Sequence, residues 1–282
     1  MRIYILTALL GAFLLPMVTA LVMPSQHKPD SGRKLSATTG VSQPLWYSDE
    51  ARTQLTVQFG LVNDGADTTK PELTESRLFI NGSEFDRQRW RAMLNNGLRP
   101  QNSAAIPPGK YVLFSMELGR YFEKPGVYKI QWKGRHFESD ELQIRVERMR
   151  SLDRNGRDPS QPADSKKTIW AGISLPNCLH ISNDAESHVR LEFSLLNETD
   201  KAANPDLDSS NLLINGQALN AWRSILDKAI GPEHRKAIKP GAALSFACDC
   251  DDYFTKPGLY RIQWKGNGFE SPKVACRVIL RK

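Results

Sequence analysis

The residues with the most reactive side chains are four cysteines, all in the second half of the chain: Cys178, Cys248, Cys250 and Cys276. Thiols form disulfides, bind zinc or act as nucleophiles. Zinc sites usually place two residues between paired cysteines, but Cys248 and Cys250 have one residue between them, so the spacing does not favour a metal site. On a strand their Cα atoms would lie about 6.6 to 6.8 Å apart, the upper limit for a disulfide. We therefore expect them not to pair with each other unless the strand bends.

The histidines and the acidic clusters form no catalytic or metal-binding motif. His180 and His188 are close in sequence, but their spacing matches no zinc motif. Acidic residues cluster at 249–252 and 206–208, without the pattern of a calcium-binding loop. The chain also has no Gly-x-Ser-x-Gly elbow, no His-Glu-x-x-His and no phosphate-binding glycine loop. We predict no catalytic residue, no cofactor, no metal and no enzymatic activity.

The first residues have the features of an export signal. Arg2 precedes an apolar run that ends in Val18-Thr19-Ala20, a sequence suited to signal peptidase. We predict a signal peptide over residues 1–20, a disordered tether over 21–34 and secretion to the periplasm or cell envelope. An uncleaved membrane anchor is the alternative, although the run is short for a span and no later stretch is long enough.

The net charge of +7 is modest and scattered along the chain. Its densest basic run, residues 147–167, mixes arginine and lysine with aspartate, proline and serine. A nucleic-acid site would interleave basic residues with aromatic ones on a folded face, and no such stripe is present. We expect a solvated linker there and no binding of nucleic acid.

An internal duplication organises the rest of the chain. Residues 124–139, KPGVYKIQWKGRHFES, return at 256–271 as KPGLYRIQWKGNGFES. The similarity extends upstream at an offset of 132 as far as residue 90 and, beyond a two-residue difference between residues 82 and 90, at an offset of 134. Two units of about 100 residues can each hold their own core, unlike short solenoid repeats. The predicted domains are repeat 1 over 35–147, a linker over 148–167 and repeat 2 over 168–282.

Within each repeat, apolar and polar residues alternate in short runs, which is the period of strands with one buried face. Asn81-Gly82 and Asn215-Gly216 supply the positive φ that tight turns need. Apolar residues at helical spacing from Trp222 to Ile230 predict one short amphipathic helix, with a counterpart around Trp90. Trp46 and Trp170 lie outside the alternation and are not expected to be buried. The fold class is mostly β, with two antiparallel sandwiches and one inserted helix in each.

Each repeat resembles the immunoglobulin-like and fibronectin type III-like domains of exported bacterial proteins. The resemblance rests on the order PPGKYVLFSMEL followed by YFEKPGVYKIQW, in which a Pro-Gly turn precedes a tyrosine. A fainter similarity links the unit to the bacterial intracellular proteinase inhibitor domain. In immunoglobulin-like folds this tyrosine forms a tyrosine corner, which would involve Tyr128 and Tyr260.

The same resemblance suggests a disulfide. In immunoglobulin-like sandwiches the first and last strands can lie side by side, which would bring Cys178 close to Cys276. We therefore expect a bridge from Cys178 to one of the other three cysteines, with Cys276 favoured and Cys248 and Cys250 otherwise acting as small core residues. Repeat 1 has no cysteine at all, so the fold itself does not depend on such a bridge.

These features predict an exported, non-enzymatic binding or structural protein, expected to be a monomer. Two immunoglobulin-like modules would face a macromolecular partner at the cell envelope, either a protein or a polysaccharide. The alternatives are an inhibitor of an exported hydrolase and an accessory module of an envelope enzyme, because sandwiches host many functions.

Overall fold

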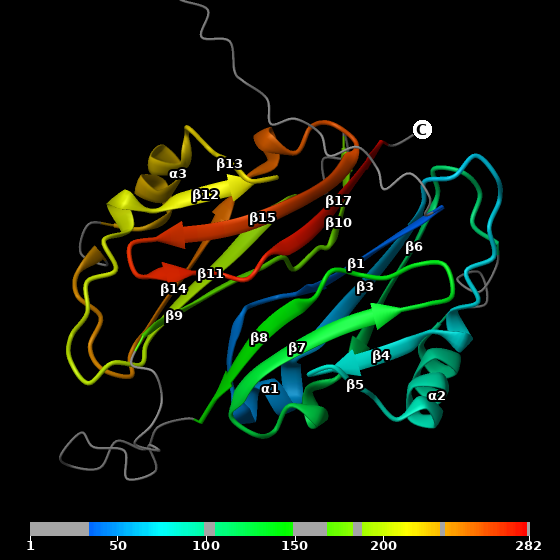
Figure 1. Ribbon diagram of the computed structural model, residues 1–282, viewed down its shortest axis with the longest axis horizontal. Coiled ribbons are helices and arrows are strands. Elements are labelled where there is room, and N and C mark those ends of the chain that lie inside the picture. Colours follow the sequence, from blue (N-terminus) through cyan, green and yellow to red (C-terminus); the bar gives the residue numbers. More distant parts are fainter. Residues whose placement is uncertain (1–33, 99–104, 149–167, 183–187, 232–234, 281–282) are drawn as a thin grey trace, which may run out of the picture.

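A computed structural model describes residues 34–98, 105–148, 168–182, 188–231 and 235–280. The predicted signal peptide, nearly all of the tether and nearly all of the linker lie outside the described residues. The two repeats form two separate sandwiches that lie side by side (Figure 1).

Repeat 1 contains two sheets. In the first, strand order is β1-β3-β6, formed by Leu35–Val41, Thr56–Asn63 and Tyr111–Glu117. In the second, the order is β2-β8-β7-β4-β5, formed by Leu45–Tyr47, Leu142–Glu147, Gly126–Lys133, Arg77–Ile80 and Ser83–Glu84. All of these pairings are antiparallel except that of β2 with β8, which is parallel.

Repeat 2 has the same plan. Its smaller sheet has the order β14-β11-β9, formed by Ala243–Asp249, Arg190–Asn197 and Ile169–Ser174. Its larger sheet has the order β10-β17-β15-β12-β13, formed by Leu179–Ser182, Val274–Leu280, Gly258–Gly266, Asn211–Ile214 and Gln217–Ala218. β16, Phe269–Glu270, pairs with β15. β10 pairs with β17 in parallel, as β2 does with β8.

These strand orders define an immunoglobulin-like sandwich. The immunoglobulin fold packs a sheet that contains its first, second and fifth strands on a sheet that contains its third, sixth and seventh. Here β1, β3 and β6 form one sheet, and β4, β7 and β8 lie in the other. A helix stands in the connection that carries the fourth strand of an immunoglobulin domain: α2 (Arg87–Gly97) in repeat 1 and α3 (Trp222–Ala229) in repeat 2. The fold is therefore two tandem immunoglobulin-like sandwiches, each with a helix at the predicted place.

One helix was not expected. α1, Ser48–Gln54, follows β2 in repeat 1, where only the helix around Trp90 was predicted. Its residues are mostly polar, and only Ala51 is buried. The helix packs on the turn at Gly119, where an added Cβ atom would lie 2.0 Å from the carbonyl oxygen of Ala51. Its position thus depends on a tertiary contact and not on an apolar stripe.

Aromatic side chains fill the centre of each sandwich. In repeat 1 the ring of Phe59 stacks on Phe114 at 5.3 Å and meets Trp132 edge-on at the same distance. In repeat 2 the rings at the equivalent positions, Phe193, Phe246 and Trp264, repeat this arrangement. The buried Ser76 hydroxyl accepts hydrogen bonds from the indoles of Trp90, at 3.3 Å, and Trp132, at 3.0 Å.

Two tryptophans were expected to lie outside the core, and one of them does not. Trp46 is only 2% exposed, and its indole donates to the carbonyl oxygen of Gln43 at 2.8 Å. The parallel pairing of β2 with β8, which the alternation does not reveal, places it there. Trp170 is half-buried.

The turns have the expected backbone. Asn81 and Asn215 both have φ of 52°, and Gly82 and Gly216 follow with φ of 77° and 82°. Asparagine and glycine adopt this left-handed region at little cost. Each asparagine also accepts a hydrogen bond from the neighbouring strand, which fixes the hairpin to the sheet.

Candidate functional site: the interface between the repeats

Two ion pairs join the sandwiches. Arg277 of β17 pairs with Asp64, which follows β3 of repeat 1. Arg145 of β8 pairs with Glu198, which follows β11 of repeat 2, at 2.5 Å. The four side chains are only 14 to 19% exposed. Because water is largely excluded, loss of either partner would leave a charge in a poorly solvated place.

Backbone groups meet at the middle of the interface. The Val41 amide at the end of β1 donates to the carbonyl oxygen of Leu175 at 2.9 Å. Gly40 makes this approach possible, since an added Cβ atom would lie 2.6 Å from the same oxygen. The Cys178 amide donates to Oε1 of Gln58 at 2.9 Å. Repeat 2 thus contacts the outer face of the β1-β3-β6 sheet.

Apolar side chains complete this half of the interface. Val62 of β3, Leu179 of β10 and Ile279 of β17 form a small buried cluster of their own, flanked by Leu113 and Ile181. The outer face of a sheet in an isolated sandwich would be solvated and polar. Here that face is covered by the other repeat.

The interface is approximately two-fold symmetric. Val41 and Leu175 occupy the same position in the two repeats, at the offset of 134, and they contact each other. The two ion pairs also occupy equivalent positions, so each repeat contributes an arginine to one pair and an acidic residue to the other. Pro44 is the equivalent of Cys178 and lies against Gly172 of repeat 2. A Cβ atom added at Gly172 would lie 2.8 Å from the Cβ atom of Pro44. Each repeat therefore presents the same outer face and the same edge, as in a two-fold dimer interface.

A third ion pair breaks the symmetry. Arg261 of β15 donates to both carboxylate oxygens of Asp140 at 2.9 and 3.2 Å. The equivalent of Arg261 is Lys129, which pairs with Glu141 of its own repeat. This forked contact adds one more link between the two domains.

The expected disulfide is absent from the structure. All four cysteines are free and buried. The prediction that their strands are neighbours is right, because the Arg277 amide donates to the carbonyl oxygen of Cys178 at 3.0 Å. The two thiols are nevertheless not bonded to each other. The Cys178 Sγ lies 3.7 Å from the Thr38 carbonyl oxygen of repeat 1, whereas Cys276 is fully buried on β17.

The thiols are also weakly acidic. Burial raises the pKa of the Cys178 thiol to about 12 and that of Cys248 to about 12. Burial raises the pKa of Cys250 and of Cys276 as well. Because the thiolate is the nucleophile, these groups are unreactive at neutral pH. They act as packing residues.

This arrangement predicts how thiol reagents behave. At pH 8, Ellman's reagent should label essentially none of the native protein and all four thiols after unfolding in guanidinium chloride, without any reductant. Labelling of the native protein shows whether the thiols are buried. Labelling of the denatured protein counts the free thiols and so shows whether any are bridged. Fewer than four labelled thiols in the denatured, unreduced sample would show a bridge and contradict the structure.

Tyr128 and Tyr260 anchor the turn before their strands. The Tyr128 hydroxyl donates to the Lys124 carbonyl oxygen at 2.7 Å, and the Tyr260 hydroxyl donates to that of Lys256 at 2.9 Å. This is the geometry of a tyrosine corner. Burial raises the pKa of both phenols, although the hydrogen bond to the carbonyl oxygen lowers it in part. Both residues stabilise the turn between the sheets.

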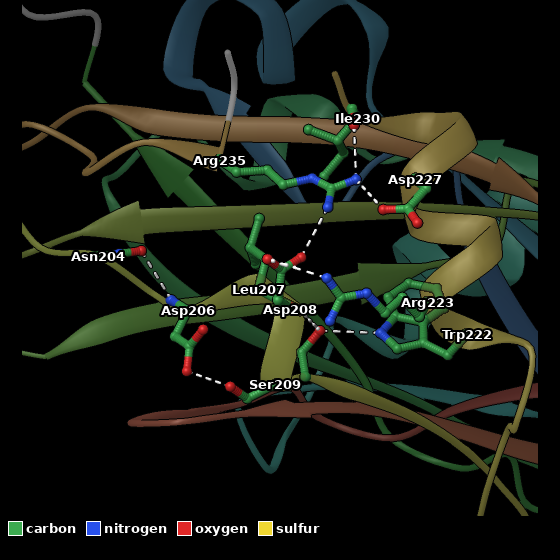
Figure 2. A network of polar contacts seen from close by, with 11 residues as sticks. Asn204, Asp206, Leu207, Asp208, Ser209, Trp222, Arg223, Asp227, Ile230 and Arg235 are labelled. Atoms are coloured by element: carbon green, nitrogen blue, oxygen red, sulfur yellow. Dashed lines mark hydrogen bonds and ion pairs between the residues drawn. The ribbon is translucent and has the colours of Figure 1, made fainter. Parts of the chain in front are cut away.

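A polar network fixes α3 to the loop before β12 (Figure 2). Arg235 donates to Asp208 at 2.8 Å, to Asp227 at 2.5 Å and to the carbonyl oxygen of Ile230 at 3.1 Å. Arg223 of the helix pairs with Asp208 at 3.5 Å. Asp208 therefore holds two arginines of its own domain, while the Asp206 carboxylate accepts a hydrogen bond from the Ser209 hydroxyl.

The remaining candidates lie apart from this network. His188 contacts Asp251 at 2.8 Å, and His180 is buried on β10. Across the described residues, no group of three histidine, cysteine or acidic side chains is placed to hold a metal ion. In the same part of the chain, no helix is long and apolar enough to cross a membrane.

No family model matches the chain, and no curated protein matches it. Solved structures similar to it include a red sea bream transglutaminase, at 10% identity over 88% of this chain and 31% of that one, with a TM-score of 0.24. Another is a 1.5-MDa bacterial ice-binding adhesin, at 10% identity over 89% of this chain and 66% of that one, with a TM-score of 0.22. A third is invasin, a bacterial integrin-binding protein, at 10% identity over 88% of this chain and 39% of that one, with a TM-score of 0.23. The chain thus spans about a third of the transglutaminase and two thirds of the adhesin. The fold assignment rests on the strand order and not on these values.

Proposed function

We propose that the chain is an exported, non-enzymatic binding or structural protein that presents two immunoglobulin-like modules, as one rigid unit, to a macromolecular partner at the cell envelope. The observation that carries the proposal is the reciprocal interface. Three ion pairs, a backbone hydrogen bond and an apolar cluster hold the modules together.

The consequence of this interface is the placement of the free surfaces. The two-fold relation puts α2 and α3 at opposite ends of the pair (Figure 1). A rigid pair of modules loses less freedom on binding than two modules on a flexible linker. The loops and edges at the two ends are therefore held at a fixed separation for a partner. Export is supported by the sequence of residues 1–20.

Export and binding can be tested together in the native host. We expect the protein in the envelope or medium fraction, with a mature N-terminus at Leu21 measured by mass spectrometry. Cross-linking in intact cells should give a defined complex, which should weaken when the interface arginines Arg145 and Arg277 are both changed to glutamate. A cytoplasmic, full-length chain would overturn the export part, and a complex unaffected by the double variant would overturn the rigid-pair part.

A further inference from the structure

Repeat 1 has a surface pocket that the interface and the polar network do not use. It lies between the start of β1, the loop after β3 and the turn after β7, and its cavity volume is about 780 Å³. Six of its lining residues have ionisable side chains: Lys34, Lys70, Lys133, Arg135, His136 and Glu138. The hydroxyl groups of Thr68 and Thr69 also line it. The pocket thus brings together three segments that are distant in sequence.

The lining carries positive charge. Four cations and one carboxylate give it a formal charge of +3. Two acidic residues outside the lining offset part of this, since Asp67 pairs with Lys34 at 3.1 Å and Glu72 with Arg135 at 3.8 Å. Counting both leaves a charge of +1.

These ion pairs do not close the pocket to an anion. The side chains of the Lys34–Asp67 pair are 59 and 75% exposed, and those of the Arg135–Glu72 pair are 71 and 42% exposed. Exposed pairs are worth at most about 1 kcal/mol. A ligand with several anionic groups can therefore engage these cations at little cost.

The duplication separates what the fold needs from what it does not. The structural part of the site recurs in repeat 2: the ion pair of Lys133 with Glu138, at 2.8 Å, has its equivalent in Lys265 and Glu270, at 2.9 Å. The other basic positions do not recur. Lys34, Lys70, Arg135 and His136 are replaced in repeat 2 by Thr168, Asn204, Asn267 and Gly268.

The same positions in repeat 2 therefore have a formal charge of zero, from one lysine and one glutamate. The sandwich forms without the extra basic groups, so folding does not require them in repeat 1. The pocket of repeat 1 thus has three cations and a histidine that the fold does not require. Their presence at one pocket indicates that they bind a ligand.

We propose that this pocket binds a segment of an acidic polysaccharide, with its cations on the carboxylate groups and its threonine and histidine side chains hydrogen-bonded to sugar hydroxyls. The aromatic residue of the lining, Phe137, is only 3% exposed. Single-stranded nucleic acid binds by stacking bases on exposed aromatic rings, and protein partners anchor large aromatic or apolar groups in such pockets. The described residues that line the pocket offer neither kind of contact. The inference goes beyond the proposed function, since it holds wherever the chain resides.

The test uses the full chain and a fluorescent oligogalacturonate as the probe. Fluorescence anisotropy should show saturable binding that weakens as salt rises to about 0.15 M, because exposed charges are screened. Changing Lys70→Asn together with Arg135→Asn installs the residues of repeat 2 and should lower the affinity about tenfold. Equal melting temperatures of variant and parent would show that the fold is intact.

The matched control makes the same change of net charge in repeat 2. Asn204→Glu together with Asn267→Glu alters the equivalent positions, and binding should stay within about twofold of the parent. An equal loss in both variants would show a diffuse charge effect and overturn the site. Absence of binding to oligogalacturonate, or tighter binding of an oligothymidylate or polyglutamate of equal charge, would overturn the assignment to polysaccharide.

Discussion

Reversing the charge of both interface arginines, Arg145→Glu and Arg277→Glu, is expected to separate the two sandwiches while each stays folded. Each new glutamate would face an acidic partner, Glu198 or Asp64, across a poorly solvated contact. Removal of one partner from a buried pair costs about 3 to 5 kcal/mol, and for these partly exposed pairs we expect about 2 kcal/mol each. Each sandwich has its own aromatic centre, so the loss falls on the interface.

The separation should be visible by two methods. Small-angle X-ray scattering should give a larger radius of gyration, and amide exchange should accelerate at the end of β1 around Val41. Arg77→Glu with Lys265→Glu is the control, because both residues form exposed ion pairs within their own domain. Restoring opposite charges with Asp64→Arg and Glu198→Arg in the double variant should bring the domains back together. An unchanged radius in the double variant would mean that the ion pairs do not hold the interface.

The alternation of apolar residues was enough to predict the sandwiches. Strand period is a local property, and Val57, Phe59 and Leu61 point into the core as the pattern requires. The role of the two tyrosines was predicted from the resemblance to immunoglobulin-like domains, which rests on the Pro-Gly turn just before each of them. The position of α1 was not predictable in this way, because it depends on the contact of Ala51 with the turn at Gly119.

The interface was missed for a different physical reason. Alternation assigns Gln58, Gly60 and Val62 to the side away from the core, but it does not distinguish solvent from a second domain. A signal was nevertheless present in the duplication. An acidic residue follows the strand in both repeats, at Asp64 and Glu198, and an arginine occupies the same place in both final strands. Charged residues that face only solvent do not have to keep the same sign at equivalent positions of two repeats. Opposite charges that are kept in both repeats therefore indicate a contact.

The buried asparagines that end β3 and β11 should be the most sensitive polar positions of the two cores. Asn63 is fully buried, and its side-chain amide donates to the carbonyl oxygens of Asp67 at 2.8 Å and Ile106 at 2.7 Å. Its Oδ1 accepts from the Gly65 amide at 2.9 Å. Asn197 makes the corresponding bonds to Lys201 and Ile238, at 2.8 Å each. One side chain thus ties two loops to the end of a strand.

Asn63→Asp keeps the shape of this side chain but replaces its donor by an oxygen. Two carbonyl oxygens would then face a carboxylate without a proton between them, and each unsatisfied buried group costs about 1 to 3 kcal/mol. We expect a loss of at least about 3 kcal/mol in the free energy of unfolding at pH 7, measured in urea. The same change at the exposed Asn96 should cost less than about 0.5 kcal/mol.

The pH dependence of the stability loss in Asn63→Asp identifies its cause. Burial and the facing carbonyl oxygens would raise the pKa of the new carboxyl in the folded state. A group with a raised folded pKa favours the folded state below its unfolded pKa, about 3.9, and loses that contribution as pH rises through the folded value. The difference between Asn63→Asp and the parent should therefore shrink at about pH 4, where the acid can donate a proton to one of the carbonyl oxygens. A difference that is constant between pH 4 and pH 7 would show that the loss comes from packing and not from the missing donor.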